Sequence, residues 1–260
     1  MLTQSSEQGE NLDLTQVPLC FIVGYKQFKP HEKHVNRKHL NDVLIILVSG
    51  TLRFTEDGIP VELHAGEYYI QYRQHQQRGE LESDACYYYV EFLGRRTDHQ
   101  KNVLPRRGIY EAGYALPLCE ELRNINMGYT QRAMLAYDLF RALSPRRIAQ
   151  PAIQHTVMEL YDYFHQHYTE QLPLEMVARR FNYSTDYLIR FFKNQYGVTP
   201  HQYITFLRIS HAKQLLEEGE QTMLAIALAC GYTDYSSFYR AFTRVTGVTP
   251  GDWAKQNEQS

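Results

Sequence analysis

The sequence predicts an α+β protein with a β-rich N-terminal half and an all-helical C-terminal half. Between residues 17 and 95, runs rich in β-branched and aromatic residues alternate with turn signals. From about residue 112 onward, apolar residues recur at helical spacing. The sequence GVTP occurs twice, at Gly197–Pro200 and Gly247–Pro250, and this repetition indicates that the helical half contains an internal repeat.

Composition limits the classes of function that are open to the chain. Its 260 residues suggest one large domain or two medium ones, and its net charge is −2. Residues 151–260 hold nine Lys and Arg against eleven Asp and Glu, so any nucleic-acid contact must depend on local placement of cations.

The four scattered cysteines form no C-x-x-C motif, which fits a reduced compartment. The longest aliphatic run, residues 43–48, is too short to span a membrane, and the polar N-terminus does not resemble a secretory signal. We therefore expect a cytoplasmic protein without a membrane partner.

The N-terminal half is expected to contain an arm, a barrel and two helices. Residues 1–16 are polar and predict a flexible arm, and residues 17–111 carry strand-like runs at 18–25, 42–54, 67–72 and 86–93. Short strands at this spacing are typical of a sandwich or a small barrel. Residues 112–143 predict two helices whose leucine stripes either pack on the barrel or pair with a second chain. The stripes comprise Leu118, Leu122, Leu135, Leu139 and Leu143.

A linker and a helical domain follow. Residues 144–151 hold two prolines around charged and small residues, which predicts a linker to a domain over residues 152–257. Within it, residues 177–200 align with residues 226–250, and each copy reads as a short helix, a turn and a longer helix. The Gly of GVTP ends a helix in a left-handed conformation, and its Thr and Pro cap and begin the next one. The matching features of the two copies are a small residue in the first helix, Ala178 and Ala227, an aromatic residue at the turn, Tyr183 and Tyr232, and the N-cap residues Ser184 and Thr233 or Asp234.

Two helix-turn-helix units joined by one long helix, Pro200–Gly219, indicate DNA binding, because such a unit places its second helix in the major groove. Arg190 and Arg240 occupy matching positions, and arginine can bind guanine through two hydrogen bonds. Alternatively these arginines are solvated surface charges, and Ile189 and Tyr239 pack within the domain. The outward faces of the two longer helices are expected to carry Thr185, Asp186, Ile189, Arg190 and Lys193, and Tyr235, Ser236, Tyr239, Arg240 and Arg244.

The C-terminal 110 residues, above all CGYTDYSSFYRAFTRVTGVTPGDW, resemble the DNA-binding domain of AraC-type (AraC/XylS) transcription regulators. The chain departs from the family where Trp253 replaces the usual Tyr and Ala254 replaces the basic residue after it. The resemblance implies base contacts at Asp186, Ile189 and Arg190, and at Tyr235, Ser236, Tyr239 and Arg240.

The β-rich half resembles, more loosely, the cupin-like sensor domain of the same family through LNDVLIILVSGTLRF, LHAGEYYI and YYYVEF. A cupin can hold a metal through His and Glu, and His34 and His39 are candidates. Val43, however, stands where a cupin would carry its Glu. We therefore predict no metal, no cofactor and no catalytic residue.

The strand at residues 86–92 carries the predicted effector site. Alternation places Tyr87, Tyr89 and Glu91 on one face. The resemblance to sugar-sensing members implies that Tyr89 stacks on the ligand beside Tyr87, with Arg37 early in the barrel and Arg78 in place of an aromatic residue. These residues suit a small-molecule effector, with a sugar or sugar derivative favoured. Alternatively, this strand face is turned to solvent or to the other domain.

The sequence therefore predicts a ligand-responsive, sequence-specific transcription regulator that is not an enzyme. Its expected partners are a double-stranded DNA operator, a small-molecule effector and a second copy in a homodimer, with RNA polymerase as a further candidate. Two alternatives stay open. One is a cupin-fold, metal-dependent enzyme fused to a DNA-binding domain, and the other is a ligand-independent dimeric DNA-binding protein.

Overall fold

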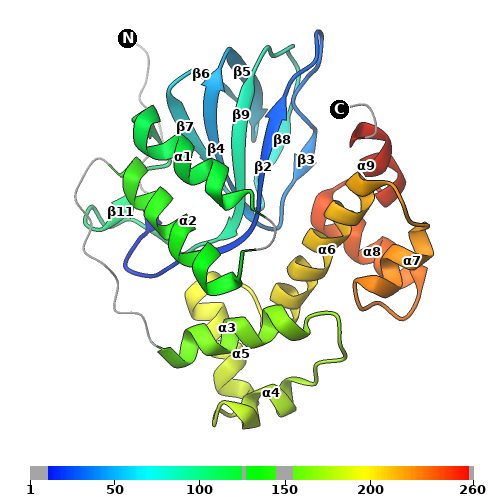
Figure 1. Ribbon diagram of the computed structural model, residues 1–260. Helices are drawn as coiled ribbons and strands as arrows, with labels where there is room; N and C mark the ends of the chain where they lie inside the picture. The colour runs from blue at the N-terminus through cyan, green and yellow to red at the C-terminus, as the bar shows by residue number, and fades with distance from the viewer. Residues whose placement is uncertain (1–10, 125–126, 145–154, 258–260) are drawn as a thin grey trace. The chain divides into compact units, whose positions relative to one another are not determined.

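The computed structural model describes residues 11–124, 127–144 and 155–257, and the chain forms two compact units (Figure 1). One unit comprises Met1–Asn36 and Asp42–Ile153, and the other comprises Arg37–Asn41 and Gln154–Ser260. The boundary lies next to the predicted linker, of which residues 145–151 fall outside the described residues. Within the described ranges, no helix is both long enough and apolar enough to cross a bilayer.

The β-rich half is built from short antiparallel strands. The predicted strand runs correspond to β2, β4 with β5, β7 and β9. Within the described residues the sheet orders are β10-β1-β11, β12-β7-β4-β9-β2 and β3-β8-β5-β6. In chain order the strands are β1 (Asn11–Asp13), β2 (Leu19–Gln27), β3 (Arg37–Lys38), β4 (Asp42–Ser49), β5 (Thr51–Glu56), β6 (Ile59–His64), β7 (Glu67–Gln71), β8 (Gln76–Arg78), β9 (Cys86–Leu93), β10 (Arg96–Thr97), β11 (Val103–Leu104) and β12 (Arg107–Ile109).

The centre of the five-stranded sheet is buried on both faces, because alternate residues of β4 enter two different cores. Val43, Ile45 and Leu47 of β4 pack with Leu52 and Phe54 of β5, between the five-stranded and four-stranded sheets. The opposite face of β4 packs against the two helices that follow the strands. This arrangement fits the predicted sandwich or small barrel.

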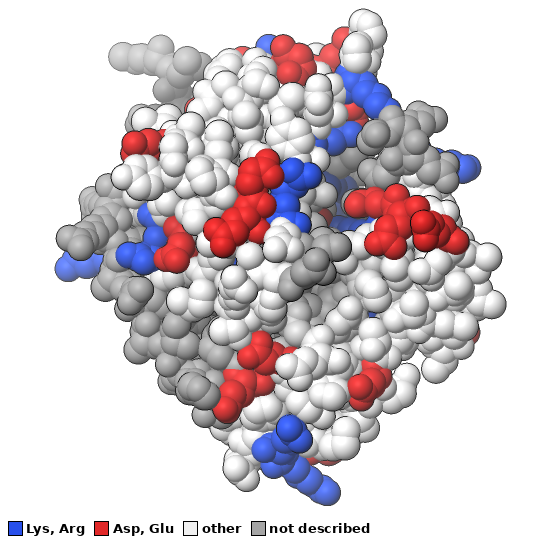
Figure 2. Space-filling model, in the orientation of Figure 1, with Lys and Arg blue, Asp and Glu red and all other residues white. Residues whose placement is uncertain are grey.

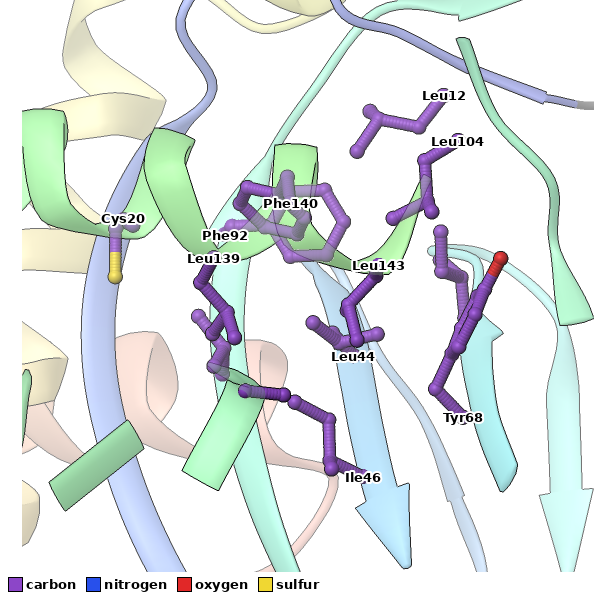
Figure 3. Packing of buried hydrophobic residues seen from close by; sticks show 14 of the residues in the cluster. Leu12, Cys20, Leu44, Ile46, Tyr68, Phe92, Leu104, Leu139, Phe140 and Leu143 are labelled. Carbon is purple, nitrogen blue, oxygen red and sulfur yellow. The ribbon is translucent and has the colours of Figure 1, made fainter. Parts of the chain in front are cut away.

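Helices α1 (Ala112–Leu122) and α2 (Tyr129–Leu143) cover that opposite face (Figures 1 and 3). Leu139 and Leu143 of α2 are buried in the same core as Leu44 and Phe92 of the sheet (Figure 3). Burying one leucine side chain stabilises the fold by roughly 1.5–3 kcal/mol. The predicted leucine stripes therefore pack on the sheet of their own chain, which is the first of the two alternatives.

The N-terminal segment requires a correction. Asn11–Asp13 forms β1 between β10 and β11, and the side chains of Leu12 and Leu14 are 0% exposed. The hydroxyl of Tyr137 on α2 donates to the carbonyl of Leu14 at 2.7 Å. The predicted flexible arm 1–16 is therefore wrong for residues 11–16, because pairing with distant strands gives this polar segment its structure. Residues 1–10 lie outside the described residues.

Residues 155–257, which make up most of the second unit, form helices joined by turns and short loops, as predicted. An aromatic core that includes Tyr161, Phe164, Phe192 and Tyr203 holds its first helices together. The helices are α3 (His155–His167), α4 (Leu174–Arg180), α5 (Thr185–Tyr196), α6 (Pro200–Glu218), α7 (Met223–Ala229), α8 (Tyr235–Thr246) and α9 (Pro250–Asn257).

Both GVTP sequences terminate one helix and begin the next, as predicted. Gly197 and Gly247 have φ of 68° and 79°, the left-handed conformation that glycine adopts without strain. The Thr199 hydroxyl accepts the backbone N–H of Gln202 at 3.2 Å and completes a capping box at the start of α6. The Thr249 hydroxyl accepts the N–H of Asp252 at 3.1 Å at the start of α9. The repeated sequence thus has one local structure in both copies.

Candidate nucleic-acid interface

The two helix-turn-helix units, α4–α5 and α7–α8, share the same turn. The N–H of Tyr183 donates to the carbonyl of Ala178 at 2.8 Å, and the N–H of Tyr232 donates to the carbonyl of Ala227 at 3.0 Å. Both alanines are buried, as expected for a small residue where two helices cross closely. The residue before each tyrosine has a positive φ, 57° at Asn182 and 82° at Gly231. The duplication seen in the sequence is therefore a duplication of backbone geometry.

Side-chain caps fix the first turn of each second helix. The Ser184 hydroxyl accepts the N–H of Tyr187 at 3.2 Å at the start of α5. The Asp234 carboxylate accepts the N–H of Ser237 at 2.8 Å at the start of α8. That backbone hydrogen bond, together with one from the Ser237 hydroxyl, lowers the pKa of Asp234. The N-terminal part of a recognition helix is the part that meets base edges, so both helices begin with an ordered contact surface.

Each second helix buries one face and exposes the other. Leu188 and Phe192 of α5 and Phe238 and Phe242 of α8 are buried. Tyr235 and Tyr239 are 37% and 39% exposed. On the outward faces, Asp186, Arg190, Lys193, Ser236, Arg240 and Arg244 are exposed, and Thr185 and Ile189 are half-buried. The structure thus brings the sequence-predicted contact residues to the solvent-facing side of their helices.

The cations on these faces are available for an external partner. Arg190, Lys193 and Arg244 form no ion pair within the part of the chain that the structure describes. Arg240 makes one weak intrahelical contact, in which its guanidinium donates to the Ser237 hydroxyl at 3.4 Å. On the face that Figure 2 shows, acidic and basic side chains are interspersed. Local placement, rather than net charge, therefore supplies the positive groups.

Sequence reasoning missed a row of aromatic rings that begins at Tyr183 and continues along α5. Tyr187, in the first turn of α5, is 44% exposed. Its ring lies 4.8 Å from the ring of Tyr183 and 6.3 Å from that of Phe191, measured between centroids. The spacing of these residues by four was the available signal, because residues four apart share a helix face. The row adds apolar surface next to Asp186 and Arg190.

The predicted effector residues lie on the inner face of the five-stranded sheet. Tyr87 and Glu91 are buried and Tyr89 is half-buried, on the face that also carries Ile45. For Tyr87 and Glu91 this excludes the alternative of a solvent-facing strand surface. Arg37 is half-buried at the start of β3, within the short segment that groups with the helical unit.

In β8, the side chain that points into the interior is that of Gln77 and not that of Arg78. The side chain of Gln77 is 0% exposed, whereas Arg78 is exposed. Neighbouring residues of a strand point to opposite faces, and the register pairs Gln77 with the buried Glu56. This placement corrects the prediction that Arg78 lines the pocket.

A buried polar network in this interior was also missed. Glu56 is 4% exposed, and its carboxylate accepts hydrogen bonds from the hydroxyl of Tyr69 at 2.6 Å and from the guanidinium of Arg106 at 2.5 Å. Two residues after Tyr69 on β7, Gln71 Nε2 lies 3.0 Å from Nε2 of the buried His34. The alternation of β5 was the only sequence signal, since it places Glu56 on the same face as Leu52 and Phe54. Among the described residues, no three His, Cys, Asp or Glu side chains gather in a way that could hold a metal ion.

Comparisons with known proteins agree with this geometry. Residues 177–256, which run from within α4 through α8 into α9, match the family model described as a helix-turn-helix domain. The chain is 25% identical over 270 residues to the HTH-type transcriptional regulator YisR of Bacillus subtilis, covering 92% of this chain and 94% of that one. It is 29% identical over 106 residues to the melibiose operon regulatory protein of Escherichia coli, covering 41% of this chain and 35% of the relative.

The fold of the whole chain has solved counterparts. ToxT from Vibrio cholerae matches with a TM-score of 0.56 and 14% identity, covering 90% of this chain and 96% of that one. A second ToxT structure, described as bound to an unsaturated fatty acid, matches with a TM-score of 0.53 and 13% identity, covering 90% of this chain and 95% of that one. These likenesses extend over both units, so they agree with an α+β fold in which a sheet-rich part precedes the helical domain. A cupin-like reading of the sheet-rich part is compatible with them.

The repeated turn, the capped second helices and the relatives together identify the biochemical class. The relatives are transcription regulators rather than enzymes. The chain is therefore a helix-turn-helix transcription regulator that binds DNA, in agreement with the AraC-type resemblance of its sequence.

Proposed function

We propose that the chain is a ligand-responsive regulator whose helices α5 and α8 bind two successive major-groove segments on one face of an operator. The observation that carries this proposal is the duplicated unit, with the same turn and an outward polar face in each copy. The connecting helix α6 has 19 residues, and at 1.5 Å per residue its length is about 28 Å. Successive major-groove segments are about 34 Å apart, so one rigid helix suits that separation.

The outward side chains suggest how bases are read. Arg190 and Arg240 suit bidentate binding of guanine, and Asp186 suits the amino group of cytosine. Lys193 and Arg244 lie in the last turns of their helices, where they would contact phosphate. Tyr239 and Ile189 offer apolar surface to a thymine methyl group. The two units present different side chains, so we expect two half-sites of different sequence.

We further propose that the interior beside Tyr89 binds a small polar effector, most simply a sugar or sugar derivative. Tyr89 offers an aromatic face, and the buried Tyr87, Glu91 and Gln71 offer hydrogen-bonding groups. A ligand with hydroxyl groups can form hydrogen bonds with polar side chains of these types, whereas an apolar ligand cannot. The name of the melibiose operon regulatory protein supports a sugar, whereas the fatty acid bound to ToxT supports an apolar occupant.

The finer features of the proposal concern assembly and place of action. We propose a homodimer that acts in the cytoplasm and contacts RNA polymerase from its DNA-bound state. Because α1 and α2 bury their leucine stripes within their own chain, a dimer would use other surfaces of the first unit. Light scattering of the full chain with and without operator tests the assembly.

Selection of duplexes from a random pool by the full chain, followed by hydroxyl-radical footprinting, tests DNA reading. We expect one enriched motif with two half-sites protected on one face, about one helical turn apart. Binding without sequence preference would contradict the proposal.

A thermal-shift screen then tests the effector, because a ligand that binds only the native state raises the stability of that state. Stabilisation by sugars supports our assignment. Stabilisation by fatty acids alone contradicts the sugar class, and a copurifying transition metal would favour the cupin-enzyme alternative.

A further inference from the structure

Arg208, on α6, contacts the first helix-turn-helix unit through the loop that leads into it. Its Nε donates to the carbonyl of Tyr168 at 2.7 Å, and its Nη2 donates to the carbonyl of Glu170 at 2.8 Å. This loop lies between α3 and α4, directly before the first unit. Hydrogen bonds from a charged guanidinium are stronger than neutral ones, and two of them fix its plane. The loop is thereby held in place on α6.

The same guanidinium contacts the second helix-turn-helix unit, α7–α8. Its Cζ lies 5.4 Å from the ring centroid of Tyr232, the turn residue between α7 and α8. The ring of Tyr232 in turn lies 5.6 Å from the ring of Phe238, edge to face, in the buried side of α8. Burial raises the pKa of the Tyr232 hydroxyl to about 12 and lowers the pKa of Arg208. A continuous set of contacts therefore runs from the loop at 168–170 to the second recognition helix.

Gly231 brings the loop and the turn into direct contact. A Cβ at this position would lie 2.3 Å from the carbonyl oxygen of Thr169. The equivalent residue of the first unit is Asn182, which has a similar positive φ and is exposed. The left-handed turn alone can therefore be made by asparagine, and it is the close approach to Thr169 that leaves room only for glycine at 231.

From these contacts we infer that Arg208 is a positioning residue that sets the distance and angle between α5 and α8, and thereby the number of base pairs that must separate the two half-sites. This inference rests on the proposed binding of both units to one operator. Each base-pair step moves a half-site by about 3.4 Å and turns it by about 35°. A rigid pair of units tolerates one spacing. A loosened pair accepts several spacings, but binds each less tightly because the second unit is less well pre-positioned.

The test uses the full chain and the duplex selected above, together with versions in which one or two base pairs are added or removed between the half-sites, and duplexes with one half-site. For the wild-type chain we expect a change of one base pair to weaken binding by about tenfold or more. For Arg208→Ala we expect about tenfold weaker binding at the selected spacing, a spacing dependence flattened to within about threefold, and unchanged half-site affinity. Tyr232→Leu should flatten the dependence in the same way.

Two matched variants should keep the wild-type spacing dependence. Tyr232→Phe keeps the ring and removes a hydroxyl that has no hydrogen-bond partner among the described residues. Arg180→Ala removes another arginine that stacks on a tyrosine, but this contact joins α4 to Tyr163 of α3. If Arg208→Ala does not bind even the half-site duplex, Arg208→Lys replaces it, because lysine keeps the charge but cannot make both loop contacts in one plane.

The outcomes separate this inference from the proposed function. If Arg208→Ala and Tyr232→Leu retain the steep spacing dependence, or if affinity for every duplex, half-sites included, falls by one common factor, the positioning role is wrong while two-site binding stands. If the wild-type chain itself shows no spacing dependence, the two-site proposal has failed.

Discussion

The ring of Tyr89 covers Gly24 on the neighbouring strand. The register of β2 and β9 places the two residues opposite each other, and a Cβ at Gly24 would lie 2.3 Å from Cζ of the tyrosine ring. Glycine thus leaves the flat surface on which the ring rests, and the ring covers backbone that glycine exposes. The same relationship occurs between Tyr68 and Gly108 on the other face of the sheet. At both positions the orientation of the tyrosine depends on the missing side chain.

A double-mutant cycle tests this contact. Gly24→Ala should destabilise the chain by about 1–3 kcal/mol, because the new methyl group forces the ring to move. In the double variant Gly24→Ala with Tyr89→Ala the methyl group has room, so the two costs should not add, and the coupling should reach about 0.5–3 kcal/mol. Urea unfolding curves of the four proteins give the values. If the free-energy costs of the two single variants add, the cost of Gly24→Ala does not come from displacing the Tyr89 ring.

Tyr89→Ala should abolish the response to the effector and leave operator binding without effector unchanged. The reason is that the effector can shift an equilibrium only through a difference in its affinity for two states, and Tyr89 is proposed to supply that contact. The measurement is operator affinity with and without the stabilising compound from the thermal-shift screen. Tyr25→Ala is the control, since Tyr25 is an exposed tyrosine on the other face of β2. A normal response in Tyr89→Ala would show that the effector binds elsewhere.

The helical unit could be predicted almost completely, because its signals are local. Caps, helix-ending glycines and an apolar stripe all act within a few residues, and the repeat presented them twice. Ser184, Thr199 and Asp234 cap the helices that the sequence indicated. The contact of Arg208 with Tyr232 could not be predicted, since it joins residues that become neighbours only when both units have packed on α6.

The β-rich unit was less predictable, because strand pairing joins distant residues. β1 has three residues, and its partners lie more than 80 residues away along the chain. The family resemblance placed Arg78 in the pocket, but the register of β8 turns Gln77 to the interior, and a shift of one residue exchanges the two faces of a strand. The ion pair between Glu56 and Arg106 joins strand regions that no sequence pattern relates.

Arg240→Ala and Arg244→Ala should have different effects on DNA binding. Both side chains are exposed on α8, but Arg240 lies nearer its N-terminal end, where base edges are met. We expect Arg240→Ala to cost about 1–3 kcal/mol and to relax preference at one base position. Arg244→Ala should weaken binding to all sequences alike. Competition among single-base variants of the selected duplex measures this, and an unchanged preference in Arg240→Ala would remove it from the base-reading set.

DNA binding should depend strongly on salt, although the helical unit is net acidic. The exposed cations Arg179, Arg190, Lys193, Arg240 and Arg244 lie on or next to the two second helices. Each phosphate contact contributes about −0.9 to the slope of log affinity against log salt, so we expect a slope steeper than about −2. Fluorescence anisotropy over a salt series measures it. A flat line would show that few of these cations contact phosphate.

His211 should make the helical unit less stable in mild acid. Its ring lies edge-on to Tyr168 at 5.8 Å, and its Nδ1 is buried with no hydrogen-bond partner among the described residues. Burial lowers the pKa of His211 below its usual 6.5, an effect that Glu218 partly opposes. The unfolded chain therefore takes up a proton near pH 6.5 while the folded chain resists it. Stability is complete above that pH and is lost as the pH falls below it.

Trp253 is the only tryptophan of the chain and lies in α9, so its fluorescence reports unfolding of this unit. We expect its thermal midpoint to fall between pH 7 and pH 5 in the wild-type chain, and to fall less in His211→Phe, which keeps an aromatic ring that cannot bind a proton. His201→Gln, at the exposed first turn of α6, which also carries His211, controls for loss of a histidine as such. An equal fall in the wild type and His211→Phe would mean that the buried His211 does not cause the acid sensitivity, and that other groups of the unit take up the protons.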